Sequence, residues 1–262
     1  MASPNKPAVV FAHGAWHQGL HWANVAQKLQ SAGYEVATPT MPSGSGPALE
    51  DGLHADSAAL KSAIETLTNQ GKDIVLAMHS YGGAYGSEAV AEWHLDPANN
   101  QPGKGRILHL LYISAMVIPK GISYVEDDPV AHTVSVEDGL IHHLEPHHRF
   151  YEHCPPTIAR YCIANLRPHS ASTFSTKTNH RGWADYDIPV TYLACKDDQA
   201  LYYDPTLLKF AGRVREAGVR GFEFVEIETD HTPWISREEE FMGVVWGVLG
   251  KAEGRGMGSA RI

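Results

Sequence analysis

The chain has 262 residues and a formal net charge of −9, and 43% of its residues are hydrophobic. This length and apolar content fit one large α/β domain, or two small ones, with a full core. The negative charge argues against nucleic acid or an anionic membrane surface as a partner. No apolar run is long enough to cross a bilayer. We therefore expect a small-molecule substrate as the partner, and a homodimer is left open as the assembly.

The cysteine content and the N-terminal residues bear on the cellular compartment. Three cysteines in a chain of this length do not make a disulfide framework. The opening residues, MASPNKPAVVFAH, lack the charged-then-apolar layout of a secretory signal. We therefore expect a reduced, cytoplasmic setting.

Apolar runs of strand length alternate with helical patterns along most of the chain. The expected strands cover residues 8–12, 34–38, 74–77, 107–113, 188–195 and 222–227. The expected helices cover residues 18–32, 51–70, 84–93, 207–217 and 241–249. Alternation of this kind predicts right-handed crossovers and a mostly parallel sheet with helices on both faces.

Residues 119–187 interrupt this pattern. The segment is rich in His and Pro and shows no strand alternation, so we expect a helical insertion that forms a lid. The predicted division is a first core part over 1–118, the lid over 119–187 and a second core part over 188–262. The tail from Gly254 onwards is expected to be frayed.

A serine lies between a buried strand and a helix in the stretch IVLAMHSYGG, residues 74–83. Strand, tight turn with Ser80, then helix is the context that a nucleophile elbow requires. Such a turn exposes the hydroxyl at the tip of the sheet, and small neighbours such as Gly82 let strand and helix approach. Met78 stands where the usual G-x-S-x-G pattern has its first Gly. We expect His79 to point away from the site and to support the turn.

A serine nucleophile needs a base, usually a His that a carboxylate orients. Asp198 follows the penultimate expected strand and His231 the last one, and functional groups gather at the carboxyl ends of parallel strands. The order Ser80, Asp198, His231 is that of the α/β-hydrolase fold. Asp197 is the rival acid, although it could instead cap the following segment. Asp230 is interpreted as a turn residue.

The intermediate of acyl transfer needs hydrogen-bond donors for its oxyanion. The residue after the nucleophile, Tyr81, offers one backbone N–H, and the loop after the first strand offers a second at Ala15. Gly14 would let that loop approach closely. Ala15 and Tyr81 are therefore the predicted oxyanion hole.

The stretch HGAWHQGLHW, residues 13–22, resembles the HGA-x-HG-x-x-x-W signature of the plant methylesterase and hydroxynitrile lyase branch of α/β-hydrolases. Residues 150–170 are similar to the lid pattern of that branch, and ACKDDQ and TDHTPWISREEE resemble its acid and histidine segments. The resemblance implies carboxylic-ester hydrolysis through Ser80, Asp198 and His231 without a cofactor. Gly14 and Thr232 stand where the lyases carry Thr and Lys, which favours an esterase.

Several residues are candidates for the wall of a substrate pocket. They are His13, Gly14, Trp16, Tyr124, Phe150, Tyr151 and Trp183. The aromatic ones could equally form the core of the lid, and His13 could pack the loop. The lid histidines His142, His143, His147, His148 and His153 match no specific zinc spacing. We interpret them as surface or pocket-wall residues and expect no metal.

These observations favour a cofactor-independent serine hydrolase that cleaves an ester or lactone of a small, fairly apolar molecule through an acyl-enzyme. Two alternatives stay open, because fold does not decide function. The first is a C–C bond hydrolase, lyase or cyclase of specialised metabolism on the same fold. The second is a ligand-binding receptor without turnover.

Overall fold

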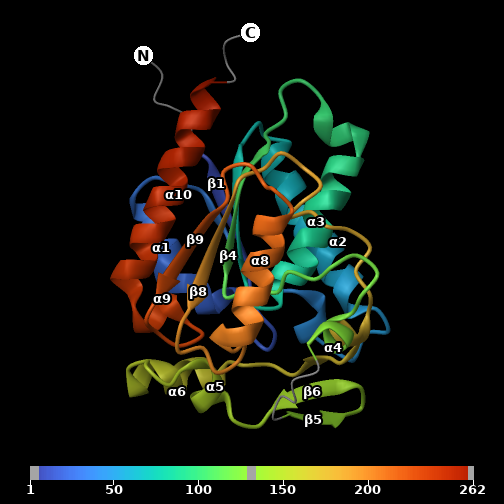
Figure 1. Cartoon of the computed structure of the whole chain (residues 1–262), viewed down its shortest axis with the longest axis vertical. Coiled ribbons are helices and arrows are strands. Elements are labelled where there is room, and N and C mark those ends of the chain that lie inside the picture. Colours follow the sequence, from blue (N-terminus) through green and yellow to red (C-terminus); the bar gives the residue numbers. More distant parts are fainter. Residues whose placement is uncertain (1–5, 129–133, 259–262) are drawn as a thin grey trace.

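One parallel sheet forms the centre of the molecule. The computed structural model describes residues 6–128 and 134–258. The strands run in the order β2-β1-β3-β4-β8-β9, and every pairing between neighbours is parallel. They are β1 (Ala8–Ala12), β2 (Val36–Ala37), β3 (Ile74–His79), β4 (Ile107–Ile113), β8 (Val190–Cys195) and β9 (Glu223–Ile227). The predicted parallel sheet is confirmed, and its strands end at one common edge (Figure 1).

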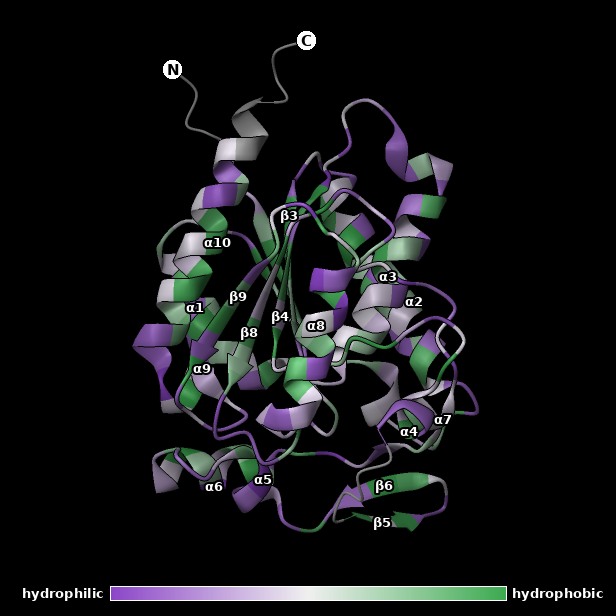
Figure 2. Ribbon diagram, viewed as in Figure 1, coloured by the Kyte–Doolittle hydropathy of each residue, from purple (hydrophilic) through white to green (hydrophobic). Residues whose placement is uncertain are grey.

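Helices cover both faces of this sheet, as predicted. The long ones are α1 (Ala23–Ser31), α2 (Gly52–Thr68), α3 (Gly82–Leu95), α8 (Leu208–Glu216) and α10 (Glu238–Gly258). The short ones are η1 (Gly19–Trp22), η2 (Pro42–Gly44), η3 (Pro97–Asn100), η4 (Tyr203–Leu207) and α9 (Pro233–Ser236). Along β1, Val9 and Phe11 pack with α1 and α10, whereas Val10 and Ala12 pack with α2, α3 and α8. Figure 2 shows the strands as mostly hydrophobic ribbons between these layers.

The closing helix α10 is longer than the sequence predicts. It continues through Gly258, so the frayed tail predicted from Gly254 is wrong up to that residue, and residues 259–262 lie outside the described part of the chain. Among the described residues, no helix is both long and apolar enough to span a membrane.

Most of the segment between β4 and β8 lies at the end of the molecule opposite the two termini, and its last residues return along α3 (Figure 1). It contains the helices α4 (Tyr124–Asp127), α5 (Pro146–Phe150), α6 (Pro156–Ala164) and α7 (Ser172–Ser175). It also contains an antiparallel sheet of β5 (Val134–Glu137), β6 (Leu140–His143) and β7 (His169–Ser170). The prediction of a purely helical lid is therefore wrong.

The lid strands were missed because they are so short. β5 and β6 have four residues each and β7 has two, which is too little for alternation to stand out. The turn between β5 and β6 is Asp138-Gly139, and both residues have positive φ, 49° and 76°. An Asp-Gly pair is a strong hairpin signal, so it was the available clue. The division into core and lid at residues 118 and 187 stays a prediction.

Met78, the departure from the elbow motif, has a complement on the facing helix. Met78 is completely buried in β3. A Cβ atom placed on Gly86 of α3 would lie only 2.5 Å from Met78 Sδ and 2.9 Å from its Cγ. Because Gly86 has no side chain, the Met78 side chain fits against α3. Helix α3 therefore packs closely on β3 although position 78 is not a glycine.

This complementarity predicts that the effect of Gly86→Ala on the free energy of unfolding depends on the residue at position 78. Gly86→Ala should lower the free energy of unfolding by about 1–3 kcal/mol through overpacking, although Ala in an open helix position gains up to about 1 kcal/mol. With Met78→Ala present, Gly86→Ala should become neutral or stabilising. Denaturant titration of the four proteins measures this. Gly243→Ala is the control, since nothing lies within 4 Å of a Cβ at Gly243 in α10. Equal effects of Gly86→Ala in both backgrounds would contradict the packing argument.

Candidate active site

Ser80 lies between β3 and α3 in a strained backbone conformation. Its φ is 54°, in the left-handed region that disfavours side chains. Its carbonyl accepts hydrogen bonds from the N–H groups of Gly83 (3.0 Å) and Met116 (2.9 Å). A Cβ on Gly82 would come within 2.5 Å of the Ala12 carbonyl oxygen, so the turn packs tightly on β1. The Ser80 hydroxyl makes no hydrogen bond to any residue that the structure describes.

Asp198 and His231 form a buried hydrogen-bonded pair. His231 Nδ1 donates to Asp198 Oδ2 at 2.6 Å, and the two side chains are 1% and 0% exposed. The other carboxylate oxygen, Oδ1, accepts from the backbone N–H groups of Ala200 and Leu201, both at 2.8 Å. Asp197, the rival acid, is exposed, and its carboxylate lies 4.0 Å from His153 Nδ1. Asp198 is therefore the carboxylate that orients the His231 ring.

His79 supports the loop that carries His231. Its Nε2 donates to the His231 carbonyl oxygen at 3.0 Å, and the two rings are 4.4 Å apart between centroids. The ring also meets Trp234 edge-on at 4.7 Å. Burial holds the pKa of His79 well below the usual value, so the ring is neutral.

The peptide between Gly14 and Ala15 is held from its carbonyl side. The Gly14 carbonyl accepts from His13 Nδ1 at 2.9 Å and from the N–H of His17 at 3.3 Å. The C=O and N–H of a trans peptide point in opposite directions, so these bonds aim the Ala15 N–H away from the loop. A Cβ on Gly14 would lie 2.9 Å from Ser80 Cβ, which places this peptide directly against Ser80.

The rings of His13 and His17 are each fixed in one neutral form. His13 Nε2 accepts from the Met41 N–H at 3.0 Å, and burial lowers the pKa of His13 to about 4. His17 Nδ1 donates to the Ala15 carbonyl at 2.8 Å, while its Nε2 accepts from the Tyr151 hydroxyl at 2.8 Å. Through their bonds to the Gly14 and Ala15 carbonyls, these two histidines hold the backbone of the loop after β1 in place.

Two backbone donors face no protein acceptor. Among the described residues, the N–H groups of Ala15 and Tyr81 donate to no carbonyl or side chain. The Tyr81 hydroxyl is anchored further back, where it donates to Asp56 Oδ2 at 3.0 Å. Asp56 also accepts from the N–H (2.9 Å) and the hydroxyl (2.6 Å) of Ser43. The two free N–H groups flank Ser80, as an oxyanion hole requires.

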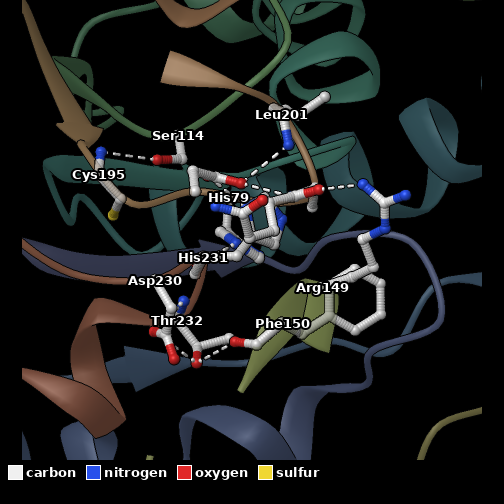
Figure 3. Close-up of polar contacts among 12 residues, drawn as sticks. His79, Ser114, Arg149, Phe150, Cys195, Leu201, Asp230, His231 and Thr232 are labelled. Atoms are coloured by element: carbon white, nitrogen blue, oxygen red, sulfur yellow. Dashed lines mark hydrogen bonds and ion pairs between the residues drawn. The ribbon is translucent and has the colours of Figure 1, made fainter. Parts of the chain in front are cut away.

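Asp230 and Thr232 connect the His231 loop to the lid. Asp230 is fully buried, and its carboxylate accepts from the His153 N–H at 2.8 Å and the Ser236 hydroxyl at 2.7 Å. The Thr232 hydroxyl donates to the Phe150 carbonyl at 2.8 Å (Figure 3). Asp230 Oδ1 also accepts from the Thr232 N–H two residues on, at 3.2 Å, so the interpretation of Asp230 as a turn residue agrees with the structure but leaves out its contact with the lid. Sequence alone did not reveal the lid contact, because His153 and Phe150 lie about eighty residues earlier in the chain.

A small cavity lies beside Ser80. It is lined by Ala15, Trp16, Ser80, Met116, Phe150, Phe174, Ala200 and Leu201. Its free volume, the space open to the centre of a water-sized sphere, is about 10 Å³. That is room for about one water molecule. The walls are apolar apart from the serine.

Two of the predicted pocket residues, Trp16 and Phe150, line this cavity, and the other five do not border it. His13 and Gly14 lie behind it in the loop after β1. Tyr151 binds His17, Trp183 Nε1 donates to the Ile118 carbonyl at 3.4 Å, and Tyr124 packs on Phe174 at 5.1 Å between centroids.

The sequence analysis missed four lining residues. Met116 follows β4, and Ala200 and Leu201 follow β8, so the rule of carboxyl strand ends could have found them. Phe174 comes from α7 of the lid and had no comparable signal.

The lid histidines lie on the surface or in a cleft wall. His147, His148 and His153 are exposed, with His148 Nδ1 3.2 Å from Glu152. His142 and His143 border an outer cleft. Within the described ranges, no three His, Cys, Asp or Glu side chains gather as a metal site would require.

The lid connection predicts a stability effect at Asp230. Asp230→Ala removes the acceptor of buried donors, so the free energy of unfolding should fall by about 2–4 kcal/mol. Asp197→Ala is the matched control, because Asp197 is an exposed aspartate that follows the neighbouring strand β8 at the same edge, and it should change this free energy by less than about 0.5 kcal/mol. Urea titration measures both. Similar values for the two variants would show that Asp230 does not carry the connection.

Burial of Asp56 predicts a pH dependence. Desolvation raises its pKa from 3.8 to about 6, against the effect of its hydrogen bonds. The folded state thus binds the proton more tightly, so the contribution of Asp56 to stability is full below about pH 4 and is lost as the pH rises through about 6. The difference in unfolding free energy between Asp56→Asn and wild type should therefore rise by about 2–3 kcal/mol from pH 4 to 7. Denaturation at several pH values measures it, and a constant difference would exclude the raised pKa.

Several known proteins are similar to this chain in sequence or in fold. The model of the "Alpha/beta hydrolase family" matches residues 9–244. The alpha/beta hydrolase nvfD of Aspergillus novofumigatus is 29% identical over 254 residues, which cover 94% of this chain and 98% of that protein. A carbendazim hydrolyzing esterase of a Nocardioides species is 33% identical over 253 residues, with 88% and 95% covered.

The structure is also similar in fold to a solved methylesterase, which is the class of protein that the motif at residues 13–22 resembles. A methylesterase from Arabidopsis has a TM-score of 0.66 at 18% identity, over 93% of this chain and 99% of its own. With the family model spanning residues 9–244, the chain belongs to the alpha/beta hydrolase family.

Proposed function

We propose that this protein is a serine esterase or lactonase that acts on a small, fairly apolar substrate. The observation that carries the proposal is the strained Ser80 turn beside the buried Asp198–His231 pair. The esterase among the relatives in sequence supports the class of reaction. The apolar walls of the Ser80 cavity support an apolar group next to the reacting carbonyl.

In the proposed reaction, Ser80 Oγ attacks the ester carbonyl while His231 Nε2 takes the hydroxyl proton. Asp198 accepts the Nδ1–H bond and stabilises the imidazolium. The N–H groups of Ala15 and Tyr81 donate to the oxyanion of the tetrahedral intermediate. The C–O bond to the alcohol then breaks, and the leaving oxygen takes the proton from His231.

Water completes the cycle by the same route. It loses a proton to His231, attacks the acyl-enzyme and releases the acid, and Ser80 regains its proton. The steps move protons and one acyl group without any change of oxidation state. Ser80 Oγ and His231 Nε2 are unpaired with each other in the described structure, and such bonds often tighten only when substrate binds.

A series of 4-nitrophenyl esters, from acetate to octanoate, tests the proposal. Ser80→Ala should lower kcat by about 10⁴-fold or more, and Asp198→Asn by about 10⁴-fold. Asp197→Asn is the matched control one residue away and should keep most of the activity, because Asp197 does not contact His231. An organophosphate should label wild type, and peptide mass spectrometry should place the adduct on Ser80.

Two results would overturn the proposal. Turnover that survives in Ser80→Ala would make Ser80 at most a proton relay, as in a C–C bond cleaving enzyme or a lyase. Saturable binding of ligand by folded wild type with no product would favour a receptor.

A further inference from the structure

An outer cleft lies next to the Ser80 cavity and shares a wall with it. Its free volume is about 220 Å³, and its lining includes Trp16, His142, Ile163, Leu166 and Arg167. Trp16 also lines the Ser80 cavity, whose free volume is only about 10 Å³. An ester is larger than the one water molecule that the inner cavity admits. The body of a substrate therefore needs space beyond Trp16, and the outer cleft is the neighbouring space.

Trp16 is held in this dividing position by the lid. It has a φ of 62°, which is strained for a side chain of this size. Its Nε1 donates to the Ile141 carbonyl in β6 at 3.0 Å, and its ring stacks on His169 at 4.8 Å. Its own carbonyl accepts from the Arg167 N–H at 2.8 Å. Trp16 thus borders both spaces and separates the inner cavity from the outer cleft that contains Arg167.

Arg167 is the fixed positive charge of the outer cleft. It also lines an adjoining hollow of about 370 Å³, together with Gln18, Ser45 and Leu140. No Asp or Glu lines either space. The Arg167 guanidinium makes no ion pair or hydrogen bond with any residue of the described ranges 6–128 and 134–258. In a chain with a net charge of −9, a free guanidinium in an acid-free cleft is suited to an anion.

We infer that the outer cleft binds the far end of the substrate and that Arg167 recognises a carboxylate there. The substrate class is then an ester with an apolar segment at the scissile carbonyl and a carboxylate at its other end. This inference rests on the proposed esterase function and specifies the substrate of the same site. The carboxylate would bond to the planar guanidinium, and the apolar stem would pack against Ile163 and Leu166.

The test compares charged esters with neutral ones of the same length. The substrates are 4-nitrophenyl monoesters of adipate, suberate and sebacate, each beside its methyl-capped diester. Shorter diacids are avoided, because their free carboxylate attacks its own ester. At one chain length, wild type should favour the anion by about 3–10-fold in kcat/KM. The preference should shrink as salt is raised, since the guanidinium is exposed to solvent.

Two variants test whether Arg167 causes the preference for the anionic ester. In Arg167→Gln the ratio between anionic and capped ester should fall to about one at every length. Arg160→Gln is the matched control, because Arg160 is another exposed arginine of the lid, bonds only weakly to Thr157 (3.5 Å) and lines neither space. It should keep the wild-type ratio. A wild-type ratio of one at all lengths, or a ratio that survives in Arg167→Gln, would overturn the inference.

Binding to Ser80→Ala separates this inference from the proposed function. Calorimetric titration with the same esters gives dissociation constants without turnover. Tighter binding of the anion, lost in Ser80→Ala/Arg167→Gln, would support the carboxylate site even if wild type hydrolysed neither ester, which would overturn only the esterase. Equal affinity for anion and capped ester would overturn the carboxylate site whatever the hydrolysis result.

Discussion

The constraint on which the site depends is the close approach of three backbone segments around Ser80. Its left-handed φ of 54° persists only because the surroundings hold it there. The Ser80 carbonyl is bonded by the loop after β4, the loop after β1 touches Ser80 Cβ at Gly14, and Gly82 lies on the Ala12 carbonyl. A side chain at either glycine would separate the serine from the Ala15 N–H. Backbone packing, rather than side-chain contact, therefore brings the candidate nucleophile Ser80 and the N–H groups of Ala15 and Tyr81 together.

The loop that carries His231 is hydrogen-bonded both to the core and to the lid. His231 bonds Asp198 towards the core, while Asp230 before it and Thr232 after it bond the lid. Phe150, whose carbonyl binds Thr232, also lines the Ser80 cavity. The candidate base His231 therefore lies between two residues that are hydrogen-bonded to the lid. The buried Asp230 carboxylate is compensated by its hydrogen bonds to His153, Thr232 and Ser236.

The sequence predicted the sheet and the order of the candidate residues because both depend on local signals. Apolar runs marked all six core strands, and Ser80, Asp198 and His231 follow three of them. The lid strands were missed because four residues carry little periodicity, although Asp138-Gly139 marked their turn. The turn role of Asp230 was predicted, but its bond to the His153 N–H was not, because no spacing rule encodes a contact between residues so far apart in the chain. Four residues that line the Ser80 cavity were not predicted either, since a wall residue such as Phe174 is defined only by tertiary packing.

The volumes around Trp16 connect access to the Ser80 cavity with the lid. An inner cavity of about 10 Å³ admits the reacting carbonyl only if its walls yield, and one wall is the Trp16 ring. That ring is tied to β6 through Ile141, and its backbone is tied to the segment before β7 through Arg167. Any opening between the inner cavity and the outer cleft must therefore disturb lid contacts. A ligand that binds the outer cleft and replaces those contacts would stabilise the open arrangement, because a ligand shifts a conformational equilibrium only by its differential affinity for the two states.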